Sequence, residues 1–104
     1  MVERLRRAAA SLPHDAVATH RGDLLRLAEQ HGIFDVRLFG SVARQTDNAG
    51  SDVDLLVRVP PRTGLMTLSS FALEAESLLG VRVDVVTEGG LRADHPIRRE
   101  AVSL

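Results

Sequence analysis

Four residue types are absent from this chain of 104 residues: it has no cysteine, tyrosine or tryptophan, and it has no lysine, since each of its 13 basic residues is an arginine. The absence of cysteine excludes disulfide bonds and thiolate metal sites, and it fits the cytoplasmic location that we expect. Without tyrosine and tryptophan, the usual aromatic platform for stacking bases is missing. We therefore expect no direct nucleic-acid binding.

Long apolar runs and a strong net charge are also lacking. No stretch approaches the roughly 20 apolar residues of a membrane span, and the N-terminal apolar segment is too weak for a signal peptide, so no membrane contact is expected. The formal net charge is −1, which favours neither nucleic acid nor an anionic membrane. The length predicts one domain, spanning residues 1–104, with a modest core.

The pattern of apolar residues predicts alternating helices and strands. Strands are expected at 33–39, 52–59 and 81–87, and helices at 2–12, 16–31, between a possible cap at Thr63 and a stop at Gly80, and from about Pro96. A short helical turn is expected at 40–44 and a polar, flexible loop at 45–51. The helix between the second and third strands is a crossover, so these strands should be parallel neighbours. The first two strands could be antiparallel. The predicted fold is α/β (α+β), a small mixed β-sheet with flanking helices.

Two carboxylates share one face of the second strand. Because strand side chains alternate, Val53, Leu55, Val57 and Val59 point to the core, whereas Asp52, Asp54, Leu56 and Arg58 point the other way. Asp52 and Asp54 then have Cα atoms about 7 Å apart. A lone Asp-x-Asp at the start of a strand usually marks only a solvated strand end.

A third carboxylate favours a functional site. If the third strand lies beside the second with its valines on the same face, Asp84 in "VRVDVV" joins Asp52 and Asp54. Three clustered carboxylates repel one another unless a cation neutralises them or one takes a proton. Oxygen ligands of this kind suit Mg²⁺, and two such ions about 4 Å apart can promote displacement at phosphorus.

Gly40 and Ser41 end the first strand and open the predicted helical turn. Backbone N–H groups at such a turn suit a phosphate, glycine permits close approach, and the Ser41 hydroxyl can donate one further hydrogen bond. Arg44, one turn later, can reach the same anion or one of the aspartates. An isolated Gly-Ser pair would more simply be an ordinary capped turn.

Together these residues resemble a known family. The spacing of Gly40-Ser41, Asp52-x-Asp54 and a later Asp84 is similar to that of the DNA polymerase β-like nucleotidyltransferase superfamily, and most closely resembles its minimal nucleotidyltransferase (MNT) group. That group often reads "GS-x-AR" before "SD-x-DL-x-V", here residues 40–44 and 51–57. The resemblance covers roughly residues 24–87. Many relatives have glycine where this chain has Gln45.

The resemblance implies an activity and a partner. Asp52, Asp54 and Asp84 would bind two Mg²⁺ ions, Gly40, Ser41 and Arg44 would hold the phosphates of ATP, and Asp84 would help to deprotonate the attacking hydroxyl. Such proteins are commonly antitoxins that transfer AMP to a tyrosine of a HEPN ribonuclease toxin encoded nearby. The predicted elements use nearly the whole chain, so we expect the acceptor on another protein. The absence of tyrosine excludes self-modification at that residue.

Alternatives stay open at this point. The chain could be a non-catalytic antitoxin of the same fold that neutralises its toxin by binding, or it could transfer nucleotides to a small molecule, although that activity usually accompanies an additional substrate domain. Four histidines, His14, His20, His31 and His95, lack metal-ligand spacing and are expected at the surface or at helix ends. Arg58 and Arg82 are expected to form structural ion pairs, and Arg92, Arg98 and Arg99 a solvated basic cluster. The nucleotide and the oligomeric state are not determined by the sequence.

Overall fold

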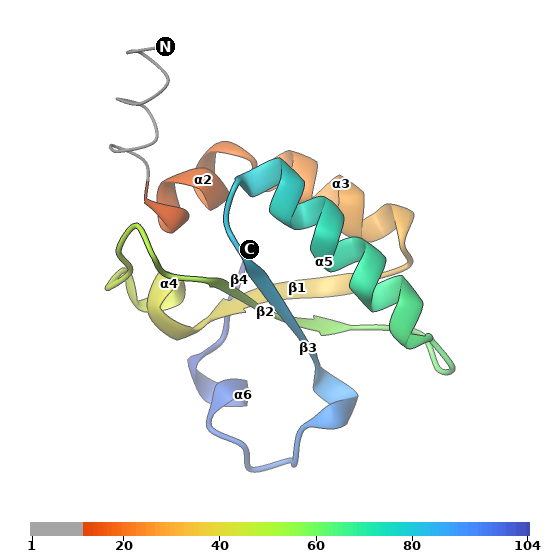
Figure 1. Cartoon of the computed structure of the whole chain (residues 1–104). Helices are drawn as coiled ribbons and strands as arrows, with labels where there is room; N and C mark the ends of the chain where they lie inside the picture. Colours follow the sequence, from red (N-terminus) through yellow and green to blue (C-terminus); the bar gives the residue numbers. More distant parts are fainter. Residues whose placement is uncertain (1–11) are drawn as a thin grey trace.

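A computed structural model describes residues 12–104, and the predicted helix at 2–12 lies, except for Leu12, outside the described residues. Figure 1 shows a sheet with α2, α3 and α5 over one face and α6 on the opposite side. The elements in chain order are α2 (Pro13–Thr19), α3 (Arg21–Gln30), β1 (Phe34–Phe39), α4 (Gly40–Arg44), β2 (Val53–Arg58), α5 (Leu65–Leu79), β3 (Val83–Thr87), the 3₁₀ helix η1 (Glu88–Gly90), α6 (Ile97–Glu100) and β4 (Val102–Ser103).

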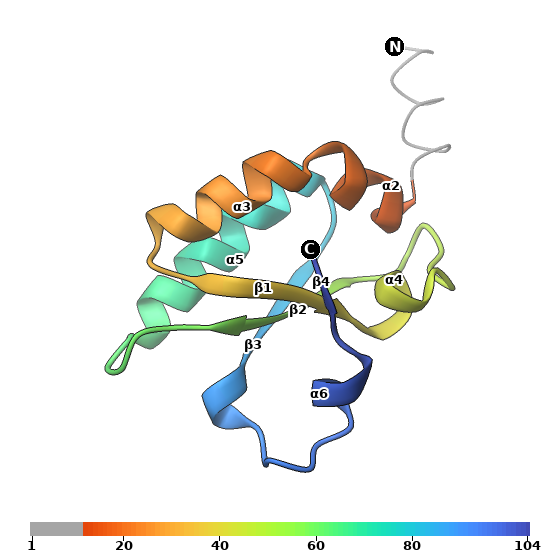
Figure 2. The same ribbon diagram turned by 180° about the vertical axis from the view of Figure 1, so that it is seen from behind.

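The sheet is mixed, as predicted. Its strand order is β3-β2-β1-β4, with β2 and β3 parallel and with β1 antiparallel to both β2 and β4. The crossover helix α5 explains the parallel pair, because parallel neighbours cannot be joined by a tight turn. The view from behind in Figure 2 shows the short β4 beside β1. The predicted fold class, a small mixed sheet with flanking helices, is therefore confirmed.

The core lies between the sheet and the three helices above it. Val53, Leu55 and Val57 of β2 are fully buried there, as alternation predicts. From α5, Phe71, Ala75 and Leu79 are buried at helical spacing and pack into the same cluster. Burial of these side chains supplies most of the stability, at about 1.5–3 kcal/mol for each large one.

Two of the predicted helices have boundaries that differ from the prediction. The expected helix at 16–31 is instead two helices, α2 and α3, which meet at His20. Pro13 starts α2 at a position where its missing N–H costs nothing, so the first helix begins three residues earlier than expected. Thr63 is not the cap of α5; Gly64 holds that position, and the Thr63 hydroxyl donates to the carbonyl of Pro60 at 2.7 Å. The predicted stop at Gly80 is confirmed, with a left-handed φ of 75°.

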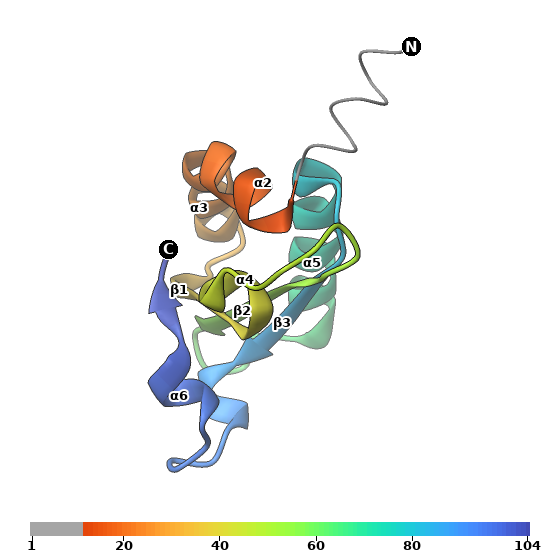
Figure 3. The same ribbon diagram turned by 90° about the vertical axis from the view of Figure 1, so that its left-hand side faces the viewer.

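The segment after β3, residues 88–103, crosses the second face of the sheet and is called the crossing segment below. A short helix, α6, follows Pro96 as predicted, but the chain then forms β4, which the sequence analysis did not predict. Figure 3 shows this segment on the side of the sheet opposite α2, α3 and α5. Leu56 of β2 points to this side and is fully buried, and η1 contacts β2. Part of the face that carries the aspartates is therefore covered.

No helix within residues 12–104 has both the length and the apolar character that a bilayer crossing requires.

The loop at 45–51 is tied to α2 by Asp47. Its carboxylate accepts a hydrogen bond of 2.9 Å from the backbone N–H of His14 and lies 2.9 Å from His14 Nδ1, and its side chain is fully buried. Burial alone would raise the pKa of Asp47, but the hydrogen bonds from the His14 backbone and ring lower it below the ordinary value. The expected flexible loop is therefore anchored at this point.

We predict that Asp47→Ala lowers the free energy of unfolding by about 1–2 kcal/mol, because it removes the partner of a free N–H in the first turn of α2. The pKa of Asp47 is lowered on folding, so its stabilisation is present above the unfolded pKa, near 3.8, and is lost as the pH falls through the folded value. Urea unfolding of both proteins at pH 7 and pH 3 measures this. Asp94→Ala, at a side chain that is 79% exposed, is the control and should change little. An equal loss of unfolding free energy in Asp47→Ala at both pH values would contradict a stabilising role for the charge of the Asp47 carboxylate.

Candidate active site

Asp54 and Asp84 lie side by side on neighbouring strands. They are direct register partners in the parallel pair of β2 and β3, as are Val53 and Val83 on the core face. Alternation then places both carboxylates on the face away from the helices. Asp84 is exposed and Asp54 is half-buried. The expected juxtaposition of these two aspartates is therefore present in the structure.

Asp52 comes one residue before β2 begins. It is near enough for its charge to act on Asp54, but within residues 12–104 no three His, Cys, Asp or Glu side chains converge on a single metal position. Asp54 and Asp84 form the close pair, and Asp52 would have to turn towards them to complete a three-carboxylate ligand set. The role of the three aspartates as metal ligands stays a prediction.

The electrostatics of Asp54 fit a cation-binding group. Burial raises its pKa above the ordinary value, the charges of Asp84 and Asp52 raise it further, and a hydrogen bond with Asp84 acts in the same direction. The guanidinium of Arg44 opposes this. A carboxylate that is costly to ionise in this position gains from a divalent cation, and the all-oxygen donor set suits Mg²⁺.

Gly40 brings the predicted phosphate turn directly against Asp54. Phe39, the last residue of β1, is the register partner of Asp54, and Gly40 follows it with a φ of 75°. A Cβ on Gly40 would overlap Asp54 Oδ2 and lie 3.2 Å from its Cγ. Only glycine satisfies both the left-handed backbone and this close approach.

Ser41 and Arg44 belong to α4, which is held in place by Val42. Val42 is buried in the core, so the short helix has a fixed position at the end of β1. Ser41 is half-buried, and its carbonyl accepts a hydrogen bond of 2.9 Å from the N–H of Thr46. Arg44 is 58% exposed and pairs with Glu100 at 3.6 Å. Glu100 is a neighbour of the site that the sequence analysis missed, since only the path of α6 brings it there.

Gln45 closes α4 in a left-handed conformation with a φ of 58°. Glycine at this position would adopt that backbone without strain, whereas a residue with a side chain pays about 1–2 kcal/mol. Gln45 therefore adds strain at the start of the loop.

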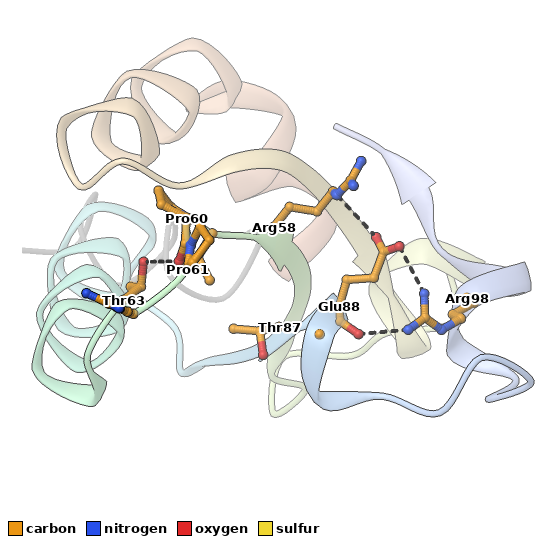
Figure 4. A pocket seen from close by; sticks show the side chains of 10 residues that line it. Arg58, Pro60, Pro61, Thr63, Thr87, Glu88 and Arg98 are labelled. Carbon is orange, nitrogen blue, oxygen red and sulfur yellow. Dashed lines mark hydrogen bonds and ion pairs between the residues drawn. The ribbon is translucent and has the colours of Figure 1, made fainter.

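A pocket of about 480 Å³ lies at the far end of the same strands, away from the carboxylates. Figure 4 shows Arg58, Thr87, Glu88 and Arg98 around it, with the loop of Pro60 and Pro61 on one side. Leu56 is buried between Asp54 and Arg58, so the covered part of the face separates this pocket from the aspartates. Its size alone does not make it the reaction site.

The charges of this pocket are paired within the fold. Glu88 bonds to Arg37, accepts from Arg98 Nη1 at 2.9 Å and lies 4.0 Å from Arg58. The hydrogen bond from Arg37 is the main cause that keeps the pKa of Glu88 below its ordinary value. The expected structural pairing of Arg58 is confirmed. The expected solvated cluster of Arg92, Arg98 and Arg99 is wrong for Arg98, whose side chain is only 25% exposed because it bonds to Glu88. Arg92 pairs with Asp94 in solvent. The expected structural pairing of Arg82 is wrong, because its side chain is exposed and no ion pair among residues 12–104 includes it or Arg99.

The four histidines lie where the sequence analysis expected them. His14 is in the first turn of α2, His20 lies between α2 and α3, His31 caps the end of α3, and His95 lies in the turn before α6. None of them lies beside the aspartate pair.

Known proteins are similar to this chain in sequence and in fold. The family model of the nucleotidyltransferase domain matches residues 20–103. A protein of Methanocaldococcus jannaschii named "putative protein adenylyltransferase" is 33% identical over 73 residues, which are 70% of this chain and 75% of that protein. The protein adenylyltransferase MntA of Thermococcus cleftensis is 34% identical over 67 residues, 64% of this chain and 68% of that protein.

Two solved structures are also similar. One, named "putative minimal nucleotidyltransferase", has a TM-score of 0.78 and 40% identity, and it covers 88% of this chain and 95% of its own. A toxin–antitoxin structure with AMP-PNP has a TM-score of 0.61 at 22% identity, covering 68% of this chain and 59% of its own, which shows a shared fold. With the family model covering most of the residues and the aspartate pair lying beside the Gly-Ser turn, this chain belongs to the nucleotidyltransferase domain family of enzymes.

Proposed function

We propose that this protein is a cytoplasmic, Mg²⁺-dependent protein adenylyltransferase that acts as an antitoxin. It transfers AMP from ATP to a hydroxyl group, that of a tyrosine, on a HEPN-type ribonuclease toxin. The observation that carries the proposal is the register pairing of Asp54 with Asp84 directly beside Gly40. Relatives named protein adenylyltransferases and a fold neighbour solved as a toxin–antitoxin with AMP-PNP support the reaction and the partner.

In this proposal each residue of the site has a defined task. Asp52, Asp54 and Asp84 hold two Mg²⁺ ions, which when bound neutralise the charge on the phosphates and on the attacking oxygen. The backbone at Gly40 and the Ser41 hydroxyl bind the β- and γ-phosphates, and Arg44 adds a cation on the same side.

The reaction is an in-line displacement at the α-phosphorus. The acceptor oxygen forms a bond to that phosphorus, the bond from phosphorus to the bridging oxygen of the β-phosphate breaks, and pyrophosphate leaves. Asp84 takes the proton of the acceptor hydroxyl, since its exposed carboxylate lies beside Asp54 on the open part of the face. Positioning and charge neutralisation supply most of the rate enhancement in transfers of this kind.

Transfer of AMP to the partner protein can be measured directly. Co-expression with the product of the neighbouring gene, followed by intact mass analysis with ATP and Mg²⁺, should show a mass gain of one AMP unit or more on the partner. The double variant Asp52→Asn, Asp54→Asn should lower the rate of this transfer at least about 100-fold and abolish neutralisation of the toxin, while the complex still forms. Neutralisation that is unchanged in the double variant would instead support an antitoxin that acts by binding alone. Absence of any nucleotide-sized mass gain on the wild-type partner would refute the transfer.

The repulsion at Asp54 should also affect the stability of the protein without metal. The pKa of Asp54 is raised on folding, so above that value its charge destabilises the fold, and stability rises as the pH falls towards the unfolded value near 3.8. Asp54→Asn should therefore raise the free energy of unfolding in EDTA at pH 7, by about 1 kcal/mol or less because solvent screens a half-exposed group. Mg²⁺ should stabilise the wild type and not the variant, as measured by thermal unfolding. A loss of stability in the variant under EDTA would contradict the repulsion.

A further inference from the structure

The segment that crosses the second face of the sheet reaches the candidate site at its end. It starts at η1 beside the edge strand β3 and returns as β4 at the opposite edge, next to β1. Arg98 fixes its course, because its guanidinium donates to the carbonyls of Glu88, Leu91 and Arg92 at 2.8–2.9 Å. Helix α6 therefore has a defined place below the sheet (Figure 3), and it contacts α4.

Glu100, the last residue of α6, meets Arg44, the last residue of α4. The carboxylate Oε1 lies 3.6 Å from Arg44 Nη1, and the two side chains are 42% and 58% exposed. The charge of Arg44 also acts on Asp54, where it opposes part of the rise in pKa that burial and the neighbouring aspartates cause. A single guanidinium therefore lies within the influence of two acids, one in the site and one on the crossing segment.

Both acids attract Arg44, and in this structure Glu100 is the one within ion-pair distance of it. If the guanidinium folded onto Asp54, it would occupy carboxylate oxygens that the proposed site needs for cations, and it would leave the Gly40–Ser41 turn. Glu100 offers a second anionic partner on the side of α4 that faces α6. Because α6 is held by Arg98, this partner is presented in a fixed position, which lowers the entropy lost when the pair forms.

We propose that Glu100 is a positioning residue for nucleotide binding. It holds Arg44 beside the phosphate turn and away from the aspartates, so that Arg44 is available to the triphosphate. This inference rests on the proposed function, since it assigns a role to a neighbour of the same site. In this proposal the crossing segment both covers Leu56 and, through Glu100, positions Arg44.

Binding of Mg²⁺ and a non-hydrolysable ATP analogue, followed by calorimetry, tests the proposal. Glu100→Gln should raise the Kd about two- to fivefold, the range expected for an exposed ion pair. In the Arg44→Gln background, Glu100→Gln should have no further effect, and Glu100→Asp should recover part of the wild-type affinity. In the transfer assay the loss should appear in KM for ATP with kcat unchanged, which a general loss of structure would not produce.

Asp94→Asn is the matched control, because Asp94 forms an exposed pair with Arg92 on the same segment at 3.7 Å. It should leave the Kd unchanged. Equal Kd values for Glu100→Gln and the wild type, or additive effects with Arg44→Gln, would overturn the role of Glu100 while leaving the proposed function intact. Failure of the wild type itself to bind the nucleotide would overturn both.

Discussion

The repulsion between two aspartates on neighbouring strands is the constraint on which the site depends. Register pairing holds Asp54 beside Asp84, and burial together with the charges of Asp84 and Asp52 makes Asp54 costly to ionise. A fold selected for stability alone would not place carboxylates there. The hydrophobic layer on the other side of β2 supplies the compensation, because Val53, Leu55 and Val57 are fully buried against the helices. β2 thus carries core side chains on one face and Asp54 on the other.

Other elements of the fold place the remaining residues of the site around Asp54 and Asp84. β1 delivers Gly40 against Asp54, Val42 anchors the short helix α4, and α6 brings Glu100 to Arg44. The crossing segment covers the far half of the acidic face at Leu56 and leaves the half near α4 open. The arginines beyond Leu56 are joined to Glu88 in an ion-pair network. The polar face is therefore divided into a candidate reaction site and a structural cluster.

Alternation and helical spacing predicted most of this arrangement from the sequence. The two-residue period of β2 and β3 placed Asp54 and Asp84 on one face, and the crossover helix predicted the parallel pairing that makes them neighbours. These features follow from local geometry, so a single sequence contains them. Metal binding by the three aspartates does not follow from this geometry and stays a proposal.

The features that were missed depend on distant partners. β4 has only two residues and exists because the edge of β1 pairs with it, so no local pattern marks it. The anchoring of the loop by Asp47 needs the N-terminus of α2, which lies 33 residues away in sequence. Glu100 reaches Arg44 only through the path of the crossing segment. Sequence periodicity predicts which face of a single helix or strand is buried. It does not predict contacts between elements that are far apart in the sequence.

The most direct test of the central claim is a crystal structure of the protein with Mg²⁺ and a non-hydrolysable ATP analogue. The account predicts metal ions between Asp54 and Asp84, with Asp52 turned to join them, and the β- and γ-phosphates at Gly40 and Ser41. A nucleotide bound instead in the pocket of Arg58 and Arg98, with no metal at the aspartates, would contradict it.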